Sequence, residues 1–309
     1  MGDDLMKKSM ITVEQVKKSF NKQLVLENVS FSIHKGEIIG LIGPNGAGKT
    51  TLIRLMNGVI ETDDGKITVG GFSPNEEGDH IRKISGVLTE GAGLYHGLSG
   101  IDNLRFFASL YGNVEEERIQ SLLDQFGLKE HQHKNVGEYS TGMKKRLGLV
   151  RALLHQPEIL FLDEPTNGLD PEGIHFVMDT LKEINQREGI TIILCSHVLH
   201  QLAEVCHRFL FLDRGTIIES GTLDQLEQKY LTEIHLQIET DENLGNIGEF
   251  GVPVEKTDAT HWRFTLPGKK EIPPLLTALL QKVPVYSAEI INRDLESLYF
   301  RIRKEENHV

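Results

Sequence analysis

The chain has 309 residues, of which 39% are hydrophobic and 25% charged, and its formal net charge is −12. This length suits one large domain with a smaller one, and the composition is that of an ordinary soluble globular protein. Proteins that bind nucleic acid through its phosphates usually present a basic face. The acidic total therefore argues against that class, and we expect no nucleic-acid partner.

Cysteine content and hydropathy bear on location. Cys195 and Cys206 are too few for a disulfide framework and favour a reducing, cytosolic setting. The longest apolar runs are far too short to span a bilayer. If the protein acts at a membrane, we expect a second chain to cross it.

The first 230 residues alternate strand-like and helical segments. Short apolar runs at residues 37–42, 159–163, 190–194 and 209–212 predict parallel strands buried on both faces. Asp170 followed by Pro171 predicts a helix start, and Gly189 predicts its end. Residues 213–216 read as a hairpin turn. Together these segments predict an α/β domain with a largely parallel sheet.

The sequence character changes near Tyr230. Residues 234–238, 262–266 and 285–291 fit strands, and helices are expected from Pro273 and near Leu295. A helix at 244–250 and a strand at 252–256 would complete a βαββαβα order, which resembles a small ferredoxin-like α+β module. We therefore predict domains at residues 10–230 and 231–309.

Residues 43–50 match the phosphate-binding loop pattern in full, between a predicted strand and a predicted helix. Glycines allow the backbone to fold around phosphates, and the helix N-terminus attracts anions. Lys49 supplies a charge for the β and γ phosphates, and the Thr50 hydroxyl is suited to a magnesium ion. The predicted nucleotide-binding residues here are Gly43, Pro44, Asn45, Gly46, Ala47, Gly48, Lys49, Thr50 and Thr51.

Two carboxylates follow the apolar strand at residues 159–163. Asp163 is predicted to hold magnesium, and Glu164 to accept a proton from the attacking water. The pair alone could be two ordinary residues at a strand end. The phosphate-binding loop makes the catalytic interpretation the stronger one, with ATP and Mg²⁺ as ligands.

Other motifs resemble those of ATP-binding cassette (ABC) ATPases. Residues 138–146, Glu-Tyr-Ser-Thr-Gly-Met-Lys-Lys-Arg, resemble the signature, usually LSGGQ followed by basic residues. Residues 163–170 resemble the Walker B and D-loop run. His197 resembles the switch histidine, and Phe20 the aromatic residue that stacks on adenine. These motifs occur in the family's order over about residues 10–225.

The resemblance implies a P-loop NTPase fold with a helical signature subdomain, in which two nucleotide domains close head to tail over two ATP molecules. Each site would combine Lys49 and the catalytic residues Glu164 and His197 of one subunit with the signature residues of the other. Those signature residues are Ser140, Thr141 and Gly142. The same N–H groups at a capped helix N-terminus could also belong to a plain helix.

The sequence departs from the usual motifs at two places. The signature has Thr141 and Met143 in place of a glycine and a glutamine, and Glu90 stands where most members have the Q-loop glutamine. Both variants resemble export-type ATPases that work with a separate integral-membrane permease in drug, antibiotic or ion efflux. Glu90 is then expected at the magnesium ion, together with Thr50 and Asp163. The protein would lie on the inner face of the cell membrane through its permease, as a homodimer or paired with another ATPase subunit.

Three other interpretations remain. An importer ATPase with a regulatory C-terminal domain is the main alternative. A DNA- or ribosome-associated ATPase is disfavoured, because the chain has one cassette and a short interval between Lys49 and Ser140. A cassette that binds ATP without hydrolysis is disfavoured by the presence of Glu164 and His197.

Overall fold

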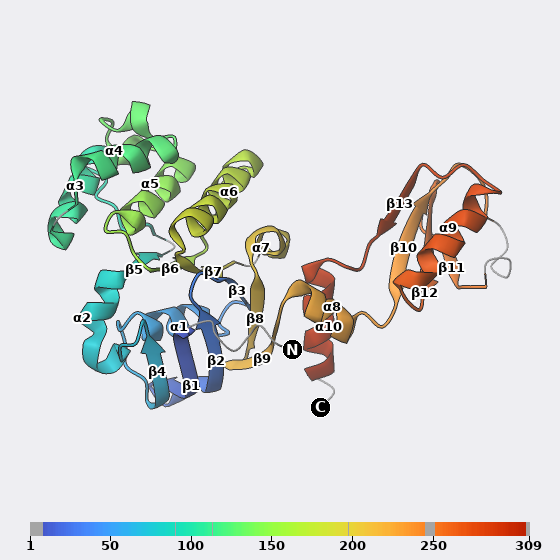
Figure 1. Ribbon diagram of the computed structural model, residues 1–309, viewed down its shortest axis with the longest axis horizontal. Helices are drawn as coiled ribbons and strands as arrows, with labels where there is room; N and C mark the ends of the chain where they lie inside the picture. The colour runs from blue at the N-terminus through green and yellow to red at the C-terminus, as the bar shows by residue number, and fades with distance from the viewer. Residues whose placement is uncertain (1–8, 90, 113, 197, 245–250, 307–309) are drawn as a thin grey trace. The chain divides into compact units, whose positions relative to one another are not determined.

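The computed structural model describes residues 9–89, 91–112, 114–196, 198–244 and 251–306. The chain forms two compact units that divide between Ser220 and Gly221 (Figure 1). The sequence placed this boundary at 230. The difference arises because helix α8 (Leu223–Tyr230) packs against α10 (Leu295–Glu306) and so joins the second unit.

The centre of the first unit is the predicted parallel sheet. Its strand order is β5-β6-β7-β3-β8-β9, and the pairs from β5 to β8 are parallel. Residues of β3 and β7 are buried throughout, as their continuous apolar runs predict. The strands are β3 (Ile38–Ile42), β5 (Ser85–Leu88), β6 (Ile159–Asp163), β7 (Thr191–Cys195), β8 (Arg208–Asp213) and β9 (Thr216–Gly221). The short β5 was not predicted.

Helix α6 begins and ends at the expected signals. Asp170 caps α6 by accepting a hydrogen bond from the Gly173 N–H at 2.8 Å, and Gly189 ends it in the left-handed conformation. Helices α3, α4 and α5 contact one another and form the predicted helical subdomain (Figure 1). The helices are α1 (Lys49–Met56), α2 (Pro74–Ile84), α3 (Gly100–Tyr111), α4 (Glu116–Gln125), α5 (Thr141–Leu153), α6 (Pro171–Glu188) and α7 (Leu199–Val205).

A separate antiparallel sheet near the N-terminus was not predicted. Its order is β2-β1-β4, from β1 (Ser9–Phe20), β2 (Gln23–His34) and β4 (Asp64–Val69). The register shifts between β1 and β2 and the positive φ of Gln15 and Asn28 mark bulges. Because a bulge resets which residues face inward, it interrupts the alternation that identifies a strand in sequence.

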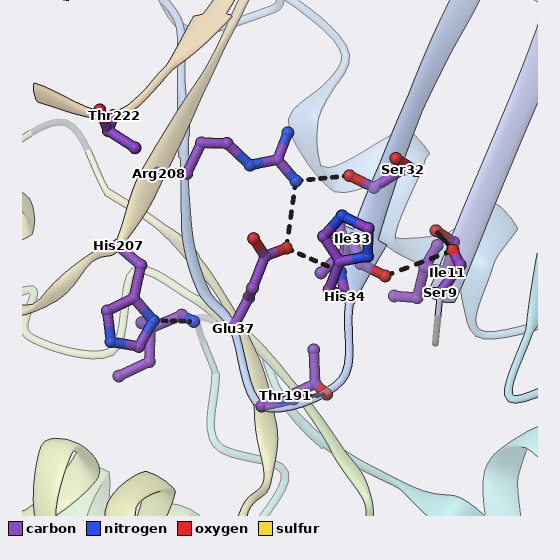
Figure 2. A network of polar contacts seen from close by, with 12 residues as sticks. Ser9, Ile11, Ser32, Ile33, His34, Glu37, Thr191, His207, Arg208 and Thr222 are labelled. Atoms are coloured by element: carbon purple, nitrogen blue, oxygen red, sulfur yellow. Dashed lines mark hydrogen bonds and ion pairs between the residues drawn. The ribbon is translucent and has the colours of Figure 1, made fainter. Parts of the chain in front are cut away.

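A polar network ties this antiparallel sheet to the parallel one. One carboxylate oxygen of Glu37 accepts the His34 N–H at 2.7 Å and the Arg208 guanidinium at 3.1 Å (Figure 2). Arg208 also donates to the Ser32 carbonyl. These bonds link the end of β2 to the starts of β3 and β8, at the sheet edge opposite the phosphate-binding loop.

The second unit contains an antiparallel sheet with the order β11-β12-β10-β13. This is the strand order of the predicted ferredoxin-like module. Alternate residues of β10 face a core that includes Trp262, Phe264 and Leu279. Its elements besides α8 and α10 are β10 (Ile234–Glu239), β11 (Val254–Lys256), β12 (His261–Leu266), α9 (Ile272–Leu280) and β13 (Ser287–Ile290). The helix expected at 244–250 falls almost entirely outside the described residues.

Candidate active site

The topology brings the phosphate-binding loop, Asp163 and Glu164 to one edge of the parallel sheet. Strands β6, β7 and β3 are adjacent and parallel, so their carboxyl ends lie side by side. The phosphate-binding loop leaves β3 at this edge, and Asp163 ends β6. Crevices outside the carboxyl ends of parallel strands are the usual ligand sites in α/β folds.

Lys49 is directed into the phosphate-binding loop. It is 8% exposed, and its ammonium donates to the Gly43 carbonyl at 2.7 Å and to the Pro44 carbonyl at 3.1 Å. A phosphate oxygen is a stronger, charged acceptor than either carbonyl. The loop therefore holds a cation where phosphates can replace these internal acceptors.

Gly48 explains why this part of the loop requires glycine. Its φ is +108°, and a Cβ there would lie 2.6 Å from Cδ2 of Leu26. Leu26 belongs to β2, so the antiparallel sheet packs directly under the loop. Ala47 is buried in the same core, behind the loop surface.

Thr50 and Asp163 meet across the site. The Thr50 hydroxyl donates to the Asp163 carboxylate at 2.8 Å. A hydroxyl and a carboxylate are hard oxygen ligands of the kind that Mg²⁺ prefers, and this ion normally takes its remaining ligands from water and phosphate. The arrangement of these two side chains therefore fits a magnesium ion.

Glu164 follows directly after β6 and has an unusual backbone. Its φ is +51°, and its N–H donates to the Cys195 carbonyl at 2.8 Å. Burial raises the pKa of the Cys195 thiol well above its usual value, and the nearby Asp163 carboxylate raises it further. Cys195, at the strand end beside the two carboxylates, is thus fully buried.

These groups line one cavity of about 470 Å³. Two lining residues, Val25 and Asn167, were not predicted as site residues. Val25 gave no local signal, because it reaches the cavity through the unpredicted antiparallel sheet. The lining residues are Val25, Asn45, Gly46, Gly48, Lys49, Thr50, Thr51, Asp163, Glu164 and Asn167.

The signature residues line a different cavity, of about 350 Å³. Ser140 caps α5 by accepting the Met143 N–H at 3.2 Å. This cavity includes none of the phosphate-loop residues. Its lining is Ser140, Thr141, Gly142, Arg146, Gly168, Leu169, Asp170 and Gly173. One chain therefore presents the two predicted halves of a site at separate places.

Among the described residues, Phe20 is a predicted site residue that lies outside both cavity linings. Phe20 ends β1 with its side chain 43% exposed, and the Lys18 ammonium lies 5.4 Å from its ring centre. Phe20 is absent from the cavity lining, and its adenine contact stays a prediction. Glu90 and His197 lie outside the described residues.

Comparisons with known proteins agree with this geometry. The family model described as "ABC transporter" matches residues 26–167. The uncharacterized ABC transporter ATP-binding protein YhcH of Bacillus subtilis is 32% identical over 96% of this chain and 97% of its own length. The linearmycin resistance ATP-binding protein LnrL of the same organism is 36% identical, over 70% of each chain.

A solved structure titled as the ATP-binding subunit of an ABC transporter is also similar. It matches with a TM-score of 0.66 and 31% identity, over 72% of this chain and 93% of its own. The similarity in sequence, the fold and the arrangement of the phosphate-binding loop lead to one conclusion. This chain belongs to the ABC transporter family, as an ATP-hydrolysing, nucleotide-binding subunit.

Proposed function

We propose that this ATPase subunit drives export of a drug, antibiotic or ion through a separate integral-membrane permease, using Mg-ATP bound between two head-to-tail subunits. The separation of the two cavities is the observation that carries this proposal. Lys49 and Glu164 line one cavity, and Ser140, Thr141 and Gly142 line the other. A second subunit, either a copy of this chain or a related one, would supply the missing half of each site.

The predicted site residues would have distinct parts in hydrolysis. The Lys49 ammonium would bind the β and γ phosphates, and the N–H groups of the loop from Gly43 to Thr51 would surround them. Thr50 and Asp163 and, as a prediction, Glu90 would hold a magnesium ion, whose positive charge would neutralise the phosphate oxygens. Glu164 would accept the proton of the attacking water, and His197 is predicted to assist. Phe20 is predicted to stack on adenine.

A membrane partner and an export role have separate support. The described residues include no helix long and apolar enough to cross a membrane. The similarity to a linearmycin resistance protein favours antibiotic efflux over the importer alternative. The protein would then work in the cytoplasm, bound to the inner membrane face through its permease.

Replacement of the proposed general base tests this function. Glu164→Gln keeps the side-chain shape but cannot accept the proton, so hydrolysis should fall by on the order of 10²–10⁴-fold. ATP binding should persist and hold two subunits together. Size-exclusion chromatography with ATP and magnesium should show a dimer that the nucleotide-free variant lacks. Near-normal turnover would move the base elsewhere, and the absence of an ATP-dependent dimer would count against the shared site.

A further inference from the structure

The backbone conformation of Glu164 indicates that this residue is held in place by its surroundings. A residue that precedes proline normally takes an extended conformation with φ near −120°. Glu164 precedes Pro165 but has φ of +51°. A non-glycine residue persists in such a conformation where its surroundings enforce it.

The enforcing contacts lie on both sides of this residue. The Cys195 carbonyl accepts the Glu164 N–H at 2.8 Å. The Lys145 ammonium donates to the Glu164 carbonyl at 2.9 Å. The first contact belongs to the neighbouring strand end, whereas the second comes from α5, a helix outside the sheet.

Lys145 is well suited to this contact. It is 6% exposed, which is unusual for a lysine, and it lies on the buried side of α5 with Leu149 and Ala152. A buried ammonium requires strong acceptors, and a hydrogen bond from a charged donor is stronger than a neutral one. The tight packing of α5 fixes where this donor lies.

The same helix also contributes to the cavity lined by the signature residues. Ser140 caps its start beside Thr141 and Gly142, and Arg146 lines that cavity directly. Lys145 lies next to Arg146, but its contact is with Glu164, which lines the cavity at the phosphate-binding loop. One helix therefore connects two places. Its signature end would face the partner's nucleotide, and its Lys145 contacts Glu164, the proposed general base of its own chain's site.

We propose that Lys145 is a positioning residue that sets the backbone of Glu164 and links it to the signature helix. The proposal rests on the function proposed above for Glu164. Movement of α5 when the signature binds a partner's γ-phosphate then shifts the Glu164 carboxylate in the same chain. The two ATP sites of a dimer are coupled through this contact.

The test compares Lys145→Met, which removes the donor, with Lys145→Gln, which keeps an N–H donor without the charge. In the full-length protein, Lys145→Met should lower kcat by about tenfold or more, with KM for ATP within about twofold of wild type. Lys145→Gln should recover kcat to within about fivefold. Lys182→Met, on the exposed side of α6, is the control for loss of a lysine charge.

Other outcomes would overturn the proposal. Wild-type kcat in Lys145→Met would remove the positioning role. Equal losses of kcat and of thermal stability in both variants would make Lys145 a packing residue. If Lys145→Met fails to fold, Lys145→Gln decides alone, because loss of its kcat would contradict a donor role. Glu164→Gln is measured in parallel: normal turnover there rejects the proposed base, whereas slow turnover there with normal Lys145→Met rejects only the present inference.

Discussion

At the scale of single residues, Gly215 shows how a position remote in sequence shapes the nucleotide site. It follows Arg214 in the two-residue turn between β8 and β9, and both have positive φ, as type I′ hairpins require. Its carbonyl accepts the Glu27 N–H at 2.8 Å, and a Cβ on Gly215 would lie 2.4 Å from the Val25 carbonyl. Because Val25 lines the nucleotide cavity, the turn supports one wall of that cavity.

Gly215→Ala should therefore displace β2 at Val25 and distort the cavity wall that Val25 forms. We expect KM for ATP to rise by several-fold and stability to fall by about 1–3 kcal/mol, from strain and steric overlap together. Gly71→Ala is the matched control, since Gly71 also has positive φ but open space around it. Thermal unfolding and ATPase assays measure both effects. If the two variants behave alike, backbone strain explains the result and the contact with Val25 does not.

At the scale of elements, α3 presents an apolar surface to solvent. Phe106 is 41% and Leu110 67% exposed, and Tyr95 lies edge-on to Phe106 at 5.0 Å between ring centres. Contiguous exposed apolar groups of this kind mark interaction sites. The surface lies on the helical subdomain, and we expect the proposed permease to bind there.

A double substitution tests that expectation. Phe106→Ser with Leu110→Ser should abolish co-purification with the membrane partner and leave basal ATPase activity within about twofold, because neither residue contacts the nucleotide cavity. Leu280→Ser, at a residue 63% exposed on α9, controls for a lost surface leucine. Retained co-purification of the double variant would place the permease contact on another surface.

At the scale of the whole molecule, the position of the boundary between the units has a testable consequence. Helix α8 buries Leu226 and Tyr230, and it contacts α10 near the end of the chain. Glu227 on the same helix pairs with Lys269 at 3.0 Å and with Arg293. These contacts assign α8 to the second unit, although the sequence pattern predicted a domain boundary only after Tyr230.

A chain ending at Ser220 should fold as a monomer with cooperative thermal unfolding. A chain ending at Tyr230 should aggregate more readily, because α8 would expose Leu226 and leave Glu227 without its two cations. Light scattering and calorimetry on the two truncations measure the difference. Better behaviour of the longer chain would restore the boundary that the sequence suggested.

Continuous local patterns account for what could be predicted. The apolar runs of β3, β6, β7 and β8, the cap at Asp170 and the phosphate-binding loop each depend on residues within a few positions of one another. The physical causes are burial on both faces, a satisfied helix end and a glycine-rich turn. Each acts between neighbouring residues, so each can be recognised from the sequence. Strands β10 and β12 of the second unit were predicted from the same kind of local pattern, an alternation of apolar residues.

What the sequence by itself determined is therefore the phosphate-binding loop in its α/β framework, with Lys49, Thr50, Asp163 and Glu164 as the candidate active residues. The tertiary structure alone decided that Val25 forms a cavity wall, that Lys145 reaches Glu164, and that α8 belongs to the second unit. Each of these depends on contacts between segments far apart in the chain, such as the bulged β1–β2 pair or α8 with α10. Such contacts are fixed by which buried surfaces fit together, and no local pattern of residues encodes that fit.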